Sequence, residues 1–210
     1  MTQTSAASAA QRLTLQTFQS DRLRRDHADL AAEPQFRDIA EFFFAEIYGP
    51  RDFTNRDAQA RRLHAIVGYL PGVALKDVES VLQLLELTQR LDDTLLAALR
   101  QLGHDGDALD AATYDCAYRL ADNYDRRVEQ LELIRASMYR VHDLTMRPLF
   151  GAALARVQPI AQLAGLGEIV HFLALGYRAV KPVREIHRFV ETIIMREHDL
   201  LDRVYARDEP

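Results

Sequence analysis

The fold is decided by a stretch at residues 42–57, which reads FFFAEIYGPRDFTNRD. Three consecutive phenylalanines close an apolar helical pattern, and Gly49-Pro50 then ends the helix because proline cannot continue it. Thr54 and Asp57 have the spacing of a capping box, in which two side chains satisfy free N–H groups at a helix start. The stretch therefore predicts a helix end, a tight loop and a second helix start in close succession.

The rest of the chain has the composition of a helical protein. Apolar residues make up 48% of its 210 residues, whereas glycine and proline number only 9 and 7. The long segments are rich in leucine, alanine, arginine, glutamate and glutamine, which are strong helix formers, and runs of β-branched residues are nearly absent. We therefore predict an all-α protein, a single-domain bundle of about seven to eight helices over residues 11–210, behind a flexible N-terminus at residues 1–10.

Apolar residues at helical spacing give the expected helix positions. The predicted ranges are 8–31, 36–48, 54–70, 74–90 with a continuation to 102, 108–145, a helix from 148 onward, 168–180 and 183–206. An uninterrupted helix over 108–145 would be about 57 Å long at the usual rise per residue, so we expect a break near Asn123. The helices at 36–48 and 183–206 carry the densest apolar patterns and are expected to be central.

Charge and cysteine content restrict the classes of partner and compartment. The net charge is −5, which disfavours nucleic acid as a partner because that class needs a basic surface. Arginines 22, 24 and 25 are interleaved with acids and are interpreted as a solvated helix face. The single cysteine, Cys116, cannot form a disulfide within the chain and favours a reducing compartment. No segment approaches the ~20 apolar residues of a membrane span, so we expect a cytoplasmic protein with no membrane span.

Two parts of the chain are also similar to a known family. The first comprises Phe42-Phe43, EIYGPRDF at residues 46–53 and Arg56-Asp57, and the second comprises GYRA at residues 176–179, Phe189, Ile193, Arg196-Glu197 and Leu200-Leu201. With residues 85–87 and 91–92 and the final helix, they resemble an uncharacterised proteobacterial family of helical proteins over residues 36–205. Glu46 departs from the family pattern, where an aspartate is expected, but both are acids. The resemblance implies an all-helical fold and no particular activity.

The loop in the first stretch provides one candidate site. Tyr48, Asp52, Arg56 and Asp57 combine carboxylates, a guanidinium and a phenol near a helix start, where such groups bind ligands or perform acid–base chemistry. The alternative is structural, because Asp and Thr at helix starts usually cap the helix. We favour the structural role and keep the four residues as a ligand or structural polar cluster.

Metal binding is a second hypothesis. Glu168 and His171 have the Glu-x-x-His spacing that places two ligands on one helical face in di-iron bundles. Such a site needs a second copy of the motif and further inward glutamates, and the sequence has no second copy. His187, Glu191 and His198 lie near one face of the last helix, but the apolar stripe lies elsewhere, so we expect them on the outer face. A lone Glu-x-x-His arises easily by chance, so the favoured interpretation of Glu168 and His171 is a spacing without function.

The predicted helix at 108–145 carries Tyr114, Tyr118 and Tyr124 near Cys116. Tyrosines gathered in this way form either an aromatic ligand pocket or part of the core, with hydroxyls that reach the surface. We expect the second arrangement, with Cys116 as a buried, inert thiol.

No function class has a sufficient motif. The chain lacks phosphate-binding loops, nucleophile elbows, His-Glu-x-x-His and paired Cys-x-x-Cys, so common nucleotide and hydrolase chemistries have no support. The leading hypothesis is a non-enzymatic helical protein that acts through a protein partner or a small apolar ligand. The alternatives are a ferritin-like or haem-oxygenase-like metal or haem enzyme and, less favoured, a ligand-responsive regulator. The aromatic excess at residues 42–44 further predicts a homodimer contact, and no cofactor is specified.

Overall fold

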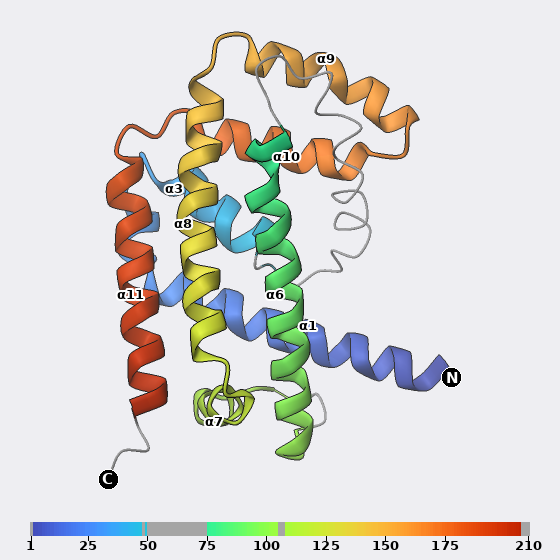
Figure 1. Ribbon diagram of the computed structural model, residues 1–210, viewed down its shortest axis with the longest axis vertical. Helices are drawn as coiled ribbons and strands as arrows, with labels where there is room; N and C mark the ends of the chain where they lie inside the picture. Colours follow the sequence, from blue (N-terminus) through green and yellow to red (C-terminus); the bar gives the residue numbers. More distant parts are fainter. Residues whose placement is uncertain (1, 48, 50–74, 105–107, 207–210) are drawn as a thin grey trace.

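The computed structural model describes residues 2–47, 49, 75–104 and 108–206 (Figure 1). Within these ranges the chain is all-α and contains no β-strand, which confirms the predicted fold class. No described helix is long and apolar enough to cross a membrane. The elements are α1 (Thr2–Asp26), α2 (Ala28–Ala32), α3 (Arg37–Phe42), the π-helical turn η1 (Phe43–Ile47), α6 (Leu75–Gln101), α7 (Ala111–Ala121), α8 (Tyr124–Met146), α9 (Phe150–Leu163), α10 (Gly167–Val180) and α11 (Ile186–Ala206).

The long helices α6, α8 and α11 run side by side, with α8 between the other two (Figure 1). Helix α1 contacts α6 and crosses this layer, and α3 packs against α10. Helices α9 and α10 pack together at the end of the bundle where α8 finishes, and α7 closes the opposite end beside α6 and α11. Residues far apart in the sequence, from α1 and α11 in particular, therefore lie close together inside the bundle.

Two apolar clusters stabilise this arrangement. The main core joins α1, α3, η1, α6, α7, α8 and α11, and the smaller α9/α10 core joins those two helices with the end of α8. In the main core, the rings of Phe36 and Phe189 are fully buried with centroids 5.3 Å apart. Burying one such side chain contributes about 1.5–3 kcal/mol. The helices expected to be central, at 36–48 and 183–206, do supply the largest buried side chains.

The three phenylalanines at positions 42–44 pack against other residues of the same chain. A π-helical turn begins at Phe43, so the predicted helix continues in altered geometry. Phe43 and Phe44 are buried in the main core, whereas Phe42 packs against Phe172 of the α9/α10 core at 5.2 Å between centroids. The run thus connects the two cores, and an exposed aromatic surface is no longer a reason to expect a dimer. The homodimer itself stays a prediction.

The predicted break in the helix at 108–145 is present between α7 and α8. Asp122 adopts a left-handed backbone conformation with φ of 44°, which ends α7. The Tyr205 hydroxyl of α11 fixes the turn, because it donates to the carbonyl of Tyr118 at 3.1 Å and accepts from the Asn123 N–H at 3.3 Å. The start of α7 is capped by Asp110, whose carboxylate accepts from the Thr113 N–H at 2.8 Å.

Other boundaries differ from the predicted ones. The helix expected over 8–31 is divided at His27 into α1 and α2, and α1 begins at Thr2, inside the segment predicted as a flexible N-terminus. The helix expected over 54–70 lies outside the described residues. The segment predicted at 74–90 and its continuation to 102 form a single uninterrupted helix, α6.

Candidate functional site

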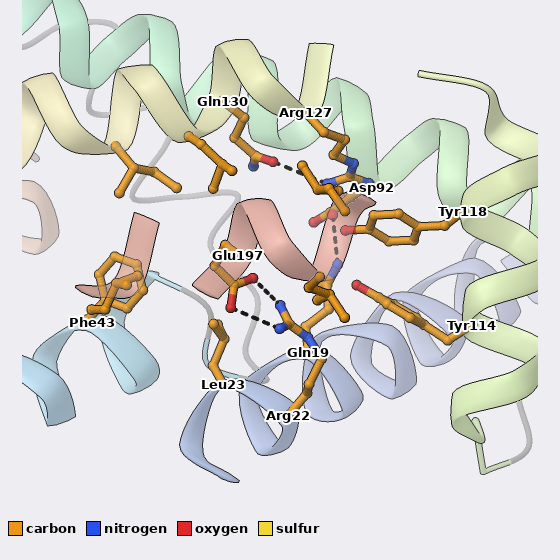
Figure 2. Close-up of a pocket in the computed structure, with 15 residues that line it drawn as sticks. Gln19, Arg22, Leu23, Phe43, Asp92, Tyr114, Tyr118, Arg127, Gln130 and Glu197 are labelled. Carbon is orange, nitrogen blue, oxygen red and sulfur yellow. Dashed lines mark hydrogen bonds and ion pairs between the residues drawn. The ribbon is translucent and has the colours of Figure 1, made fainter. Parts of the chain in front are cut away.

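A polar cavity lies inside the bundle between α1, α6, α7, α8 and α11 (Figure 2). Its volume is about 40 Å³, measured as the space open to the centres of water molecules. Eight of the side chains around it are polar or charged and seven are apolar. They are Gln19, Arg22, Asp92, Tyr114, Tyr118, Arg127, Gln130 and Glu197, and then Leu23, Phe43, Leu131, Ile134, Ile193, Leu200 and Leu201. A mixed lining of this kind inside a helical bundle makes the cavity the first candidate for a site.

An ion pair between α1 and α11 forms one wall of the cavity. The Arg22 guanidinium donates from Nη1 and Nη2 to the two carboxylate oxygens of Glu197, at 2.9 and 2.7 Å. His27 is fully buried, and its Nε2 lies 3.1 Å from Oε1 of the same carboxylate. Burial acts to raise the pKa of Glu197, but the charge of Arg22 and the hydrogen bonds from His27 and Arg22 outweigh it and lower the pKa to about 2. Glu197 is therefore ionised at neutral pH.

The second buried acid, Asp92, has the opposite behaviour. It accepts a hydrogen bond from Nε2 of Gln19 at 3.3 Å. Burial raises its pKa above the ordinary value, more than the positive charge of Arg127 and the hydrogen bond from Gln19 lower it. The fold thus favours the neutral form of Asp92 beside the cavity.

Arg127 of α8 lies across the cavity from α1. Its Nη1 donates to Oε1 of Gln130 at 3.2 Å, and its Nη2 donates to the carbonyl of Leu91 at 3.4 Å. The guanidinium carbon sits 4.5 Å from the centroid of the Tyr118 ring, within the range of a cation–π contact. Gln130 in turn donates to Thr88 at 2.8 Å. These contacts hold a buried positive charge at a fixed position.

The phenol of Tyr114 points into the cavity (Figure 2). The residue is only 3% exposed, and the neighbouring Tyr118 phenol interacts with its hydroxyl, but no described group meets full hydrogen-bond geometry with it. Burial, with the neighbouring Tyr118 phenol, raises the pKa of Tyr114 well above its usual value, so the hydroxyl is protonated at neutral pH. The Nε of Arg22 is a second buried donor without a hydrogen-bond partner. A buried donor left unpaired costs about 1–3 kcal/mol, so these two atoms need a partner.

The tyrosine prediction was therefore correct for only part of the cluster. Tyr124 does present its hydroxyl near the surface, where it donates to Asp202 at 2.6 Å. Tyr114 and Tyr118 are buried with ring centroids 4.7 Å apart. Cys116 is exposed, contrary to the predicted burial, because a residue two positions from each tyrosine lies on the opposite side of α7.

A second candidate is an exposed apolar surface along α9, here called the α9 surface. Its large side chains are unusually open to solvent: Met146 is 52% exposed, Leu149 74%, Ile160 59% and Leu163 92%. Leu149, which precedes the helix, also has a left-handed backbone with φ of 66°. Such a backbone costs a non-glycine residue of order 1–3 kcal/mol.

The candidate residues predicted from sequence are not part of either feature. Tyr48, Asp52, Arg56 and Asp57 lie outside the described residues. Glu168 and His171 lie on α10 and are both exposed. In the described part of the chain, no three histidine, cysteine, aspartate or glutamate side chains gather in a way that could hold a metal ion. The metal hypothesis gains no further ligand there and stays a prediction.

Comparison with known proteins identifies the family to which the chain belongs. A family model described as Domain of unknown function (DUF8198) matches residues 1–210. The chain belongs to this family. No curated protein and no solved structure matches it. The DUF8198 description names no reaction, ligand or partner, in agreement with the predicted resemblance to an uncharacterised family.

Proposed function

We propose that this DUF8198 protein functions by binding a protein partner, and that the α9 surface receives an acidic amphipathic helix of that partner. The observation that carries the proposal is the exposure of Leu149 and Leu163, at 74% and 92%. Neighbouring exposed apolar side chains usually mark an interaction site, because a partner that covers them removes their apolar surface from water. The proposal follows the partner-binding half of the hypothesis drawn from the sequence.

The spacing of the exposed residues fits one continuous docking face. Leu149, Ala152, Arg156, Ile160 and Leu163 are all exposed and follow one another at intervals of three or four residues. On an α-helix this spacing forms a single stripe. Helix α9 has 14 residues and is about 21 Å long, which is sufficient for a helical peptide to lie along it or across it.

The backbone strain at Leu149 supports the same proposal. Its left-handed conformation is unfavourable for leucine, and its side chain is placed in water. Both features reduce the stability of the isolated chain. Residues that break such local rules tend to occur at functional positions, where they contribute to binding.

Charge indicates which helix would bind. Between Met146 and Leu166 the sequence contains Arg147 and Arg156 and no acidic residue, although the whole chain carries a net charge of −5. A partner helix with an apolar stripe flanked by acidic residues would complement this surface. A second copy docked through the same surface would instead bring Arg156 of each chain close together, which is unfavourable.

The test uses two designed helical peptides that share one leucine stripe, with glutamates flanking it in the first and lysines in the second. Fluorescence anisotropy should show the glutamate peptide binding the full chain more tightly at low salt. Leu163→Gln should weaken this binding about tenfold, since one buried leucine contributes on the order of 1.5–3 kcal/mol. Met195→Gln is the matched control, because Met195 is 57% exposed on α11.

Other outcomes would overturn the proposal. Equal binding of the two peptides, or none, contradicts an acidic helical partner. Self-association that is lost in Leu163→Gln, followed by sedimentation velocity, would assign the surface to a second copy. Binding to vesicles containing anionic lipid, lost in the same variant, would assign it to a membrane surface.

The location we propose is the cytoplasm. The support is the single cysteine, Cys116, which is exposed and therefore open to oxidation outside a reducing compartment.

A further inference from the structure

We propose that the cavity between α1, α6, α7, α8 and α11 is a binding site for a small carboxylate anion of the size of formate or acetate. This inference rests on the interior of the bundle and is independent of the partner proposed for α9. The bundle interior offers buried hydrogen-bond donors, positive charge and an apolar wall around a space of limited size. Each of these properties restricts the chemistry of the occupant.

The volume sets the size. A cavity needs about 10–15 Å³ in this measure to hold one water molecule. The cavity of about 40 Å³ therefore accepts a group of only a few non-hydrogen atoms. Nucleotides, sugars and haem are much too large.

The unpaired buried atoms indicate whether the occupant of the cavity donates or accepts hydrogen bonds. The hydroxyl of Tyr114 and the Nε of Arg22 are both buried and have no hydrogen-bond partner in the described structure. The Nε–H is only a donor, and the phenol is a good donor. An occupant that accepts hydrogen bonds would satisfy these donors, and a carboxylate is a strong acceptor with two oxygens.

The charge balance favours an anion over a cation. The cavity is lined by two guanidinium groups, of Arg22 and Arg127, and by two acids, Glu197 and Asp92. Glu197 is occupied by Arg22 and by His27. Arg127 donates to the side-chain oxygen of Gln130 and to the carbonyl of Leu91, which are neutral groups, so its guanidinium places positive charge beside the cavity. An anion in the cavity would be attracted to this charge in the interior, where charge interactions are strong.

The apolar side chains explain why a carboxylate with a short hydrocarbon group fits better than an inorganic anion. Figure 2 shows Phe43 and Leu23 on the side of the cavity away from Tyr118 and Asp92. Ile134 and other aliphatic residues of α8 and α11 also line the cavity. A methyl group would contact this wall while the carboxylate meets Tyr114.

The experiment uses ¹³C-labelled acetate and formate as probes of the full chain. Line broadening of the labelled carboxylate in NMR titrations should reveal binding to the wild type. Tyr114→Phe removes one unpaired donor, keeps the ring and is expected to fold, because the hydroxyl it deletes has no partner. Binding should weaken about tenfold in this variant, the value of one hydrogen bond to a charged group.

Tyr124→Phe is the matched control, because it deletes a tyrosine hydroxyl at the surface and should leave acetate binding unchanged. Equal broadening in wild type and Tyr114→Phe would overturn the proposal, since the anion would then be bound elsewhere. Absence of broadening by either probe would also overturn it and would assign the cavity to water. Unfolding temperatures in acetate and in chloride at one ionic strength give a second measurement, and acetate should raise the wild-type value more than that of Tyr114→Phe.

Discussion

Arg22 and Glu197 are separated by 175 residues in the sequence, and yet they form a bidentate ion pair inside the bundle, with N···O distances of 2.9 and 2.7 Å. Their side chains are 13% and 12% exposed. The pair joins the first long helix to the last. It also forms a wall of the cavity, so it links the stability of the fold to the candidate site.

Replacing Glu197 with glutamine should destabilise the protein strongly. The substitution removes the buried bidentate partner of Arg22 and leaves only the longer pair with the half-exposed Asp26 at 3.2 Å, and breaking a buried pair in this way typically costs about 3–5 kcal/mol. Urea unfolding measured by circular dichroism gives the change directly. Asp29→Asn is the control, because its pair with Arg196 at 2.7 Å also reaches α11 but has an Asp29 side chain that is 63% exposed. Its cost should be about 0–1 kcal/mol, and equal losses in the two variants would contradict the buried role of Glu197.

The same carboxylate predicts acid sensitivity. The pKa of Glu197 is lowered to about 2 in the folded state, below the ordinary value of ~4.3 expected in the unfolded chain. The unfolded state therefore binds the proton first, and the stability contributed by the pair should be lost as the pH falls from about 4.5 towards 2. Free energies of unfolding measured across this range should decline less steeply in Glu197→Gln. A parallel decline in both proteins would show that other groups cause the acid effect.

Asp92 should respond to pH in the opposite direction. Burial raises its pKa, so its folded form holds a proton that the unfolded form has lost, and stability decreases as the pH rises from the unfolded pKa through the folded one. Asp92→Asn resembles the neutral acid and keeps an oxygen for Gln19. The variant should be more stable than wild type at pH 8 by thermal unfolding, with the difference shrinking towards acidic pH. A less stable variant at pH 8 would mean that attraction to Arg127 exceeds the effect of burial.

The sequence predicts some parts of this fold because the signals are local. Helical spacing in the last helix identifies Ile186, Val190 and Ile193 as inward, and all three are buried. The break near Asn123 follows from helix length, and the structure has it at the adjacent Asp122. Each of these predictions depends only on neighbouring residues.

The candidate site could not be predicted in the same way. Arg22 was interpreted with its neighbours as a solvated face, and Arg24 does form an exposed pair with Glu41 at 2.6 Å. Arg22 is buried by its place inside the bundle, where Glu197 of α11 reaches it from the far end of the chain. The unpaired hydroxyl of Tyr114 likewise exists only because several helices surround it. A sequence pattern contains no signal for such convergence.

The packing of α9 on α10 depends on a glycine. A Cβ atom at Gly151 would lie 2.4 Å from the hydroxyl oxygen and 2.6 Å from Cζ of Tyr177, so the ring would have to move. Gly151→Ala should therefore destabilise the protein by about 1–3 kcal/mol, the usual cost of overpacking. In Tyr177→Phe the nearest atom is absent, so adding Gly151→Ala to that background should cost less. Additive losses in chemical denaturation would contradict direct contact between the two side chains.

Leu149 provides a test that separates stability from binding. Asparagine tolerates the left-handed conformation better than leucine, so Leu149→Asn should relieve backbone strain on the order of 1 kcal/mol and raise the unfolding temperature by about 2–4 °C in a chain of this size. The same change removes an exposed apolar side chain from the α9 surface and should weaken binding of the glutamate-flanked peptide.

Met146→Gln is the matched control, because Met146 is 52% exposed nearby but lies in the last turn of α8 with an ordinary helical backbone. It should weaken peptide binding without the gain in stability. If Leu149→Asn is stabilised and still binds the peptide as wild type does, the strain at Leu149 has no role in partner binding.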